Sequence, residues 1–163
     1  MCASASSNAL LAKNVCAEQT SSISEQCSRG NLRGALAGSS ASVDWRFITR
    51  LNVLYKPLEL IDEKALSDAA PHKWYNQTLC QVNASVVRVG VVEGEYHWHK
   101  HDDDDEFFYV VEGKLLIDLE ERVVELAPRQ GFVVPKGVLH RTRAPQRTVI
   151  LMFENAGIIP TGD

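Results

Sequence analysis

The chain has 163 residues, of which 45% are hydrophobic and 23% charged, and its formal net charge is -4 at pH 7. This length suits a single domain with a substantial core, and the acidic balance argues against a nucleic-acid-binding protein, which normally carries a basic face. No apolar run approaches the roughly 20 residues of a membrane-spanning helix, and no Cys-x-x-Cys pair predicts a structural zinc site.

Residues 1–43 differ in composition from the rest of the chain. They hold most of the serines and many alanines but few large apolar side chains, so they bury too little surface to offset the entropy lost on ordering. We predict a disordered, low-complexity tail over 1–43. The alternatives are an organellar transit peptide, which the shortage of acidic residues favours, and an arm of defined structure. The predicted domain then covers 44–163, and the predicted location is the cytoplasm, or an organelle if the tail is a transit peptide.

The domain is predicted to begin with a strand and a short helix. Residues 45–54 are rich in strand-forming side chains and stop before Pro57. Apolar residues recur at helical spacing over 58–69, and Pro71 lies beyond them. We therefore expect a strand over 45–54 and a short helix over 58–69 on the outside of the domain.

The remainder reads as short strands separated by turn residues, and it ends in an extended tail over 158–163 that would cover an edge of the fold. Nine strands after one helix predict a small all-β, antiparallel jelly-roll barrel. The expected strand ranges are 79–82, 85–92, 95–101, 106–111, 115–119, 123–126, 131–134, 138–142 and 148–153.

Three histidines lie two residues apart in the expected strand over 95–101. Side chains of a strand alternate between its faces, so His97, His99 and His101 all project to one side. Four aspartates follow as a turn, and Glu106 opens the next apolar strand. An antiparallel pair joined at this turn would return the Glu106 carboxylate to the histidines, which is the kind of ligand set that a divalent transition metal prefers.

A further histidine follows a Pro-Lys-Gly turn at residues 135–137. His140 begins or joins a strand there and offers a fourth ligand. His99, His101, Glu106 and His140 could thus offer three nitrogens and one oxygen to one metal, with one or two coordination positions open to water or substrate. His97 shares the face and could itself be a ligand, lie behind the ligands or contact substrate, and Phe108 is expected to wall the pocket or simply to belong to the core.

These two motifs resemble those of the cupin family. The first reads His-x-His, four residues, Glu, six residues and Gly from His99 to Gly113, and the second reads Pro-x-Gly-x-x-His from Pro135 to His140. Ala144 stands where the family usually has Asn, but that position is not a ligand. The resemblance covers about residues 74–163 and is closest to small single-domain cupins described as mannose-6-phosphate-isomerase-like. It implies a double-stranded β-helix of the RmlC-like type, the four metal ligands named above and a homodimer.

The expected function follows from this site. The first hypothesis is a metal-dependent enzyme of oxygenase, isomerase or lyase type acting on a small organic molecule, with iron, manganese, zinc, nickel or copper as the cofactor. The alternative is a non-catalytic module that binds or senses a small ligand. The expected partners are a small molecule and a second copy of the chain, without nucleic acid or membrane, and the sequence identifies neither the catalytic residues nor the substrate.

Overall fold

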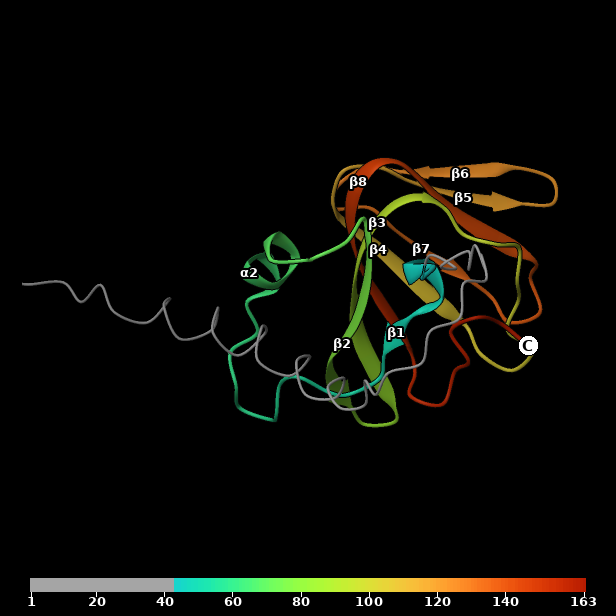
Figure 1. The fold of residues 1–163 in the computed structure, drawn as a ribbon. Helices are drawn as coiled ribbons and strands as arrows, with labels where there is room; N and C mark the ends of the chain where they lie inside the picture. The colour runs from blue at the N-terminus through green and yellow to red at the C-terminus, as the bar shows by residue number, and fades with distance from the viewer. Residues whose placement is uncertain (1–42) are drawn as a thin grey trace, which may run out of the picture. The chain divides into compact units, whose positions relative to one another are not determined.

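The computed structural model describes residues 43–163. The predicted tail therefore lies outside the described residues, apart from Val43, and the predicted boundary at residue 44 stays a prediction. Within this described range the elements in chain order are a single 3-10 turn, one helix and eight strands (Figure 1). They are η1 (Trp45–Phe47), β1 (Thr49–Arg50), α2 (Glu63–Asp68), β2 (Trp74–Val82), β3 (Ser85–Glu95), β4 (Glu106–Glu112), β5 (Leu115–Leu119), β6 (Val123–Leu126), β7 (Gly131–Val134) and β8 (His140–Asn155).

The longest strand, β8, connects the sheet. The sheet runs β1-β2-β3-β8-β4-β7, and the β5–β6 hairpin joins it through β5 and β8. The first residues of β8, His140 to Arg143, pair with β5, whereas its later residues pair with β3 on one side and β4 on the other. Every pairing is antiparallel except that of β1 with β2. The predicted all-β jelly-roll fold is confirmed.

Strand alternation divides the side chains into an inner and an outer core. On β3, Arg88 and Val92 belong to the inner face, whereas Val89 and Val91 belong to a separate outer cluster. This is the period-2 pattern of a strand that is buried on both faces. The inner core is formed by Trp74, Val92, Tyr96, Phe108, Val110, Leu115, Ile117, Leu126, Val134, Ala144, Ile150 and Met152.

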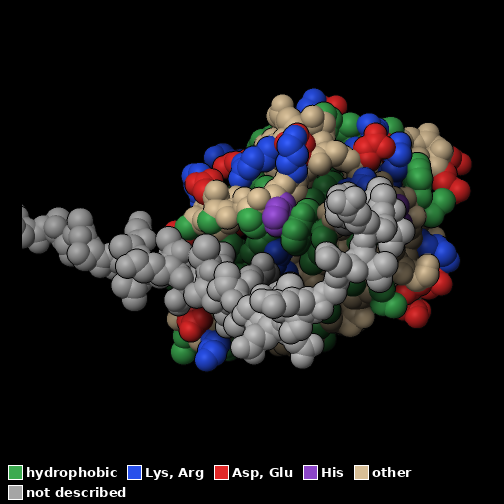
Figure 2. Space-filling view, viewed as in Figure 1, with side chains coloured by type: hydrophobic (Ala, Val, Ile, Leu, Met, Phe, Trp, Pro, Cys, Tyr) green, Lys and Arg blue, Asp and Glu red, His purple; other side chains and the backbone are tan. Residues whose placement is uncertain are grey.

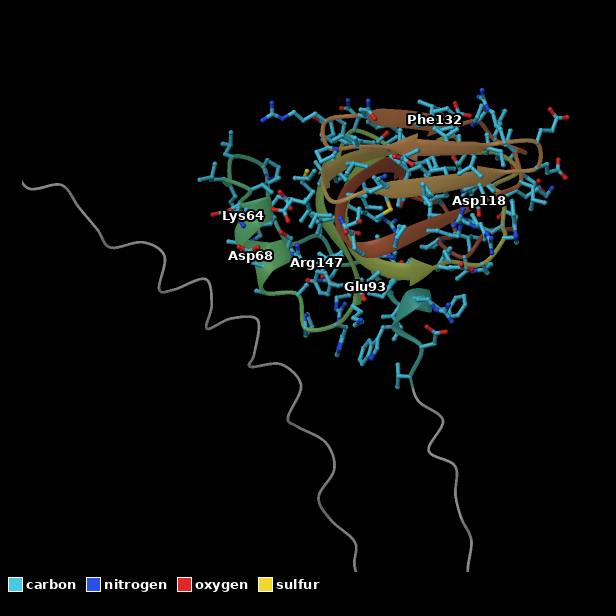
Figure 3. The ribbon with its side chains drawn as sticks, turned by 90° about the horizontal axis from the view of Figure 1, so that it is seen from above. Lys64, Asp68, Glu93, Asp118, Phe132 and Arg147 are labelled. Carbon is cyan, nitrogen blue, oxygen red and sulfur yellow. The ribbon has the colours of Figure 1, made fainter. Side chains whose placement is uncertain are left out.

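The helix α2 lies against the outer cluster, to which Leu66 adds its side chain. Arg147 ties the helix to the barrel: its Nη2 donates to the Ser67 carbonyl at 3.0 Å and its Nη1 to Glu112 at 3.0 Å. Figure 3 shows Lys64 and Asp68 on α2 near Arg147, away from Asp118. In residues 43–163, neither α2 nor η1 approaches the length that crossing a bilayer requires. On the face shown in Figure 2, positive and negative side chains of the described residues lie interspersed.

For residues 45–69, the strand prediction was wrong over most of its range, and the short helix is present but the predicted bounds were too wide. The expected strand over 45–54 is a 3-10 turn followed by the two-residue strand β1, because Asp44 caps the turn by accepting the Arg46 amide. The expected helix over 58–69 begins only at Glu63. Leu58 has a positive φ of 72°, which no helix accommodates, and Asp62 supplies the N-cap by accepting the Ala65 amide at 2.9 Å.

Four strand predictions also need correction. The expected strand over 79–82 starts five residues earlier, at Trp74, and the two expected strands over 138–142 and 148–153 are the single strand β8. Pro145 falls within β8 at an exposed position, where a missing amide donor costs little. The expected strand over 95–101 is absent from the described residues, since β3 ends at Glu95.

The turn between β4 and β5 depends on Gly113. Its φ is +82°, and an added Cβ would lie 2.5 Å from Thr148 Oγ1 and 2.7 Å from the Arg147 carbonyl oxygen. Gly113→Ala should therefore lower the free energy of unfolding by about 2 kcal/mol through backbone strain and overpacking. Urea denaturation measures this, with Gly157→Ala, where an added Cβ meets nothing within 4 Å, as the matched control. Equal midpoints for the two variants would contradict the prediction.

Candidate metal centre

The predicted ligands come from three parts of the chain. His99 lies after the end of β3 and forms an isolated antiparallel bridge with His140, each backbone amide donating to the other residue's carbonyl at 2.9 Å. Glu106 is the first residue of β4. Residues 98–101 belong to no strand, yet their side chains alternate as they would in one: His99 and His101 are buried, whereas Trp98 is exposed. The backbone bridge to His140 therefore positions His99, in place of the strand that was expected over 95–101.

The four side chains are almost completely buried: the exposed fraction is 8% for His99, 4% for His101, 6% for Glu106 and 1% for His140. Ligand atoms of the first three all lie within 4.8 Å of one another. Both His101 Nε2, at 3.5 Å, and His140 Nε2, at 3.4 Å, approach Glu106 Oε2. The rings of His99 and His140 lie 4.3 Å apart. A buried triad able to hold a metal ion is thus present, and His140 lies at its edge.

Backbone carbonyls orient two of the imidazoles. His99 Nδ1 lies 3.1 Å from the His97 carbonyl oxygen, and His140 Nδ1 lies 3.0 Å from that of Val138. A carbonyl only accepts hydrogen bonds, so both Nδ1 atoms carry the proton and both Nε2 atoms present a lone pair. This arrangement of an outer acceptor and a free inner nitrogen is typical of metal-binding histidines.

The electrostatics favour a neutral His99 beside an ionised Glu106. Burial and, to a smaller extent, the neighbouring His140 lower the pKa of His99 to about 4. Burial alone would raise the pKa of Glu106, but the contacts with His101 and His140 lower it below its ordinary value. Burial opposes protonation of His101, yet the contact with Glu106 outweighs burial and raises its pKa. At neutral pH the cluster therefore offers an ionised carboxylate.

Metal affinity should decrease on acidification because protons compete for His101. Since Glu106 raises the pKa of His101 above 6.5, the loss should begin near neutral pH and approach about 10-fold per pH unit below it, as one proton is displaced per ion bound. Titration with Zn²⁺ or Mn²⁺ between pH 8 and pH 5.5 measures this. An affinity that stays constant across this range would contradict the prediction.

The donor atoms fit a metal by a second criterion. Among residues 43–163, Glu106 Oε2 and His140 Nε2 are buried without a hydrogen-bond partner, because their 3.4 Å contact lacks hydrogen-bond geometry. Buried polar atoms are rarely left unsatisfied, and each such atom costs about 1–3 kcal/mol. A cation between them would satisfy both atoms at once.

Comparison with known proteins agrees with these motifs. A family model described as "Cupin domain" matches residues 85–154. The Bacillus subtilis protein YdbB, described as uncharacterized, is 41% identical over 92 residues, which are 56% of this chain and 81% of that protein. A solved cupin-2 domain protein from Shewanella frigidimarina is 30% identical, with a TM-score of 0.57, and the match covers 59% of this chain and 94% of that one.

The chain belongs to the cupin family. A second solved structure, protein NMB1881 from Neisseria meningitidis, supports the fold alone, at 24% identity and a TM-score of 0.54 over 60% of this cupin and 99% of that chain. The predicted recognition as a small single-domain cupin is confirmed. The mannose-6-phosphate-isomerase-like grouping is not confirmed by these comparisons and stays a prediction.

Two candidate ligands of this cupin, His99 and Glu106, line a cavity inside the barrel. Its free volume is about 40 Å³, enough for about three water molecules or the end of a small ligand. Phe108 lines it, at 3% exposure, as its parity on β4 predicts. The lining comprises Thr49, Trp74, Asn76, Arg88, Val92, Tyr96, His99, Glu106, Phe108, Thr142, Ile150, Met152, Glu154 and Pro160.

His97 lies outside the ligand cluster. It is half-buried, its Nε2 lies 2.8 Å from the Thr161 carbonyl oxygen, and its ring lies 5.1 Å from that of His99. It therefore contacts a ligand residue and the C-terminal tail. Whether it contacts substrate stays a prediction.

The C-terminal tail packs against the segment that carries the histidines. The Asp163 amide donates to the Lys100 carbonyl at 3.1 Å, and the Asp102 amide donates to Asp163 Oδ2 at 2.7 Å. Gly162 has a φ of +86°, and an added Cβ would lie 2.7 Å from His99 Cβ. The predicted packing of the tail is confirmed, but residues 160–161 form a turn rather than an extended segment, and the tail packs beside the candidate ligands rather than along a strand edge.

Two charged residues of the cavity escaped sequence reasoning. Arg88 and Glu154 lie inside the barrel of this cupin, with Arg88 Nε 2.7 Å from Glu154 Oε1. A signal existed for Arg88, because it interrupts a run of valines over 86–92 and shares the parity of Val92. Glu154 gave a weaker signal at the end of an apolar strand. Burial and the nearby Glu106 raise the pKa of Glu154 to about 8, although Arg88 opposes the shift.

Proposed function

We propose that this cupin is a metal-dependent enzyme acting on a small organic molecule, with His99, His101, Glu106 and His140 as ligands of one divalent transition metal. The observation that carries the proposal is the convergence of these buried side chains, with Glu106 Oε2 and His140 Nε2 unsatisfied, at an internal cavity. A structural barrel would gain stability from apolar residues at these positions.

Some residues of the chain would hold the ion, and others would line the cavity beside it. The ion, which could be iron, manganese, zinc, nickel or copper, would supply a Lewis acid with one or two positions open to water or substrate. Glu106 contributes the negative charge, and the carbonyls of His97 and Val138 hold two imidazoles in place. Phe108 supplies apolar surface. Burial, with a smaller contribution from Glu106, raises the pKa of Tyr96 to about 12, so its hydroxyl stays protonated and donates to the Pro160 carbonyl at 3.3 Å.

A non-catalytic module that binds or senses a small ligand is the second candidate. The packing of residues 160–163 against the rim favours it, because a tail held by backbone hydrogen bonds restricts exchange with solvent. Turnover of a candidate substrate by the loaded protein would reject this alternative. Stoichiometric ligand binding without turnover would favour it.

Elemental analysis of protein purified without an affinity tag or chelator tests the metal proposal. We expect a near-stoichiometric transition metal in the natural protein and its loss in the double variant His99→Ala/His140→Ala. Both replaced side chains are buried, so circular dichroism must first establish that the variant folds. If the natural protein holds no metal and none can be loaded, the proposal is wrong. The ion found would separate oxygen chemistry, expected for iron, from Lewis-acid chemistry, expected for zinc.

A homodimer is the second part of the proposal. The segment between β1 and α2 exposes large apolar side chains, among them Leu58 at 105% and Leu60 at 89%. Such a patch is typical of an interface, and symmetric dimers are the commonest oligomers. Light scattering should give the mass of two chains, and Leu60→Glu should reduce it to one. A natural protein that stays monomeric at micromolar concentration would contradict this part.

A further inference from the structure

A positively charged side chain lies inside the barrel, in the same cavity as the candidate metal ligands. Arg88 is 2% exposed and shares the cavity with His99 and Glu106. Its Nε forms an ion-pair contact with Glu154, but among residues 43–163 neither Nε nor Nη1 has a partner with hydrogen-bond geometry. A guanidinium stays charged in proteins, and a buried, unsatisfied donor costs free energy. The cavity therefore holds a cation whose donors the chain leaves partly unused.

The charge count of the cavity points to an anion. Arg88 contributes one positive charge and a divalent ion two, whereas Glu106 and Glu154 contribute at most two negative charges. The loaded cavity would therefore carry at least one net positive charge. A buried charge is stable only when it is paired. One carboxylate brought in by a ligand would neutralise the site.

The other residues that line the cavity indicate which further groups a ligand would carry. Trp74 Nε1 and Asn76 Oδ1 belong to lining residues and are buried without a hydrogen-bond partner among residues 43–163. The lining also includes the apolar side chains of Val92, Phe108 and Ile150. The free volume of about 40 Å³ admits only a few heavy atoms. These features suit a short organic acid that also carries a hydrogen-bonding oxygen.

Resting on the proposed function, we propose that Arg88 binds the carboxylate of a small organic acid, whose second oxygen function faces the metal held by His99, His101, Glu106 and His140. The guanidinium presents donors in a planar fork that matches a carboxylate. Glu154 contacts Arg88 and also neighbours Glu106. It therefore holds the guanidinium of Arg88 close to the candidate metal ligands. Arg88 is thus a specificity-determining residue.

Glycolate and glycolamide, which have nearly the same shape but differ in charge, are suitable probes. Their binding is measured by calorimetry on the Mn²⁺-loaded and the metal-free protein, beside the metal content of each variant. Arg88→Gln removes the charge. Arg88→Lys keeps the charge, loses the fork and serves if the first variant does not fold. Arg141→Gln is the matched control, because Arg141 pairs with Asp118 and neither residue lines this cavity.

We expect the loaded natural protein and Arg141→Gln to prefer glycolate over glycolamide. Arg88→Gln should bind glycolate about 10- to 100-fold more weakly, the loss expected for one charge-assisted contact, with unchanged metal content. Arg88→Lys should also bind it more weakly than the natural protein. Equal affinity for the two probes, no binding of glycolate, or full glycolate affinity in the Arg88 variants would overturn the inference while leaving the metal proposal intact. If no Mn²⁺ or other metal loads, the proposed function fails, and the inference fails with it unless glycolate binds the metal-free protein through Arg88.

Discussion

Replacing Glu106 by alanine should lower metal affinity at least about 10-fold while leaving the barrel folded. Glu106 is the only carboxylate in the candidate ligand set, and its Oε2 lies within 3.5 Å of both His101 Nε2 and His140 Nε2. Without it, the ion would meet only neutral imidazoles, and charge neutralisation inside the barrel would be lost. Competition with a chromogenic chelator measures the affinity, and circular dichroism reports the fold.

Asp104→Ala is the matched control for this variant. Asp104 lies in the acidic turn two residues before Glu106, outside the described strands, and it belongs neither to the ligand cluster nor to the cavity lining. Its replacement should change metal affinity by less than about twofold, since surface charges interact weakly through water. Equal metal content in both variants would show that the site is placed wrongly.

Removing Arg88 alone should lower the free energy of unfolding by about 3 kcal/mol. Arg88→Met leaves Glu154 buried beside Glu106 without its cationic partner, and breaking one half of a buried ion pair typically costs this much. Urea denaturation at pH 9 measures the change, because the pKa of Glu154 is raised to about 8 and its carboxylate must be ionised for the loss of Arg88 to matter. An unchanged midpoint and slope would mean that the pair does not contribute to stability.

The double variant Arg88→Met/Glu154→Leu provides the control, because two apolar residues of similar size should restore most of the lost stability. The pH dependence of the single variant gives a second check. The folded-state pKa of Glu154 is already raised above its ordinary value of 4.5, and losing Arg88 raises it further. Stability is then retained below the unfolded-state pKa and decreases as pH rises through the folded-state pKa. Arg88→Met should therefore be more destabilised at pH 9 than at pH 5.

Much of the candidate site could be read from spacing alone. The interval from His99 to Glu106 is short, so few backbone paths can join them, and the family motifs indicated the same residues. The strands over 115–119, 123–126 and 131–134 were predicted to the residue, because each is a short, mostly apolar run that ends at turn-forming residues.

Residues 45–69 were harder to predict, because their local pattern competes with contacts made elsewhere. Leu58 and Ile61 recur at helical spacing, yet Leu58 adopts a positive φ and is fully exposed. Propensity is a weak guide where tertiary context differs from the local pattern. The strand β8 was also hard to predict, because Pro145 suggests a break. The strand nevertheless continues through Pro145, since its first residues pair with β5 and its later residues pair with β3.

Two short motifs were enough to predict a cupin and to name four candidate ligands, because their spacing resembles that of the family. The presence of Arg88 and Glu154 in the same cavity as His99 and Glu106 becomes visible only in the folded barrel. Arg88 and Glu154 are 66 positions apart in the chain (154 − 88 = 66), and they meet because β3 pairs with β8. No periodicity within either strand encodes that register, which arises from closing the barrel.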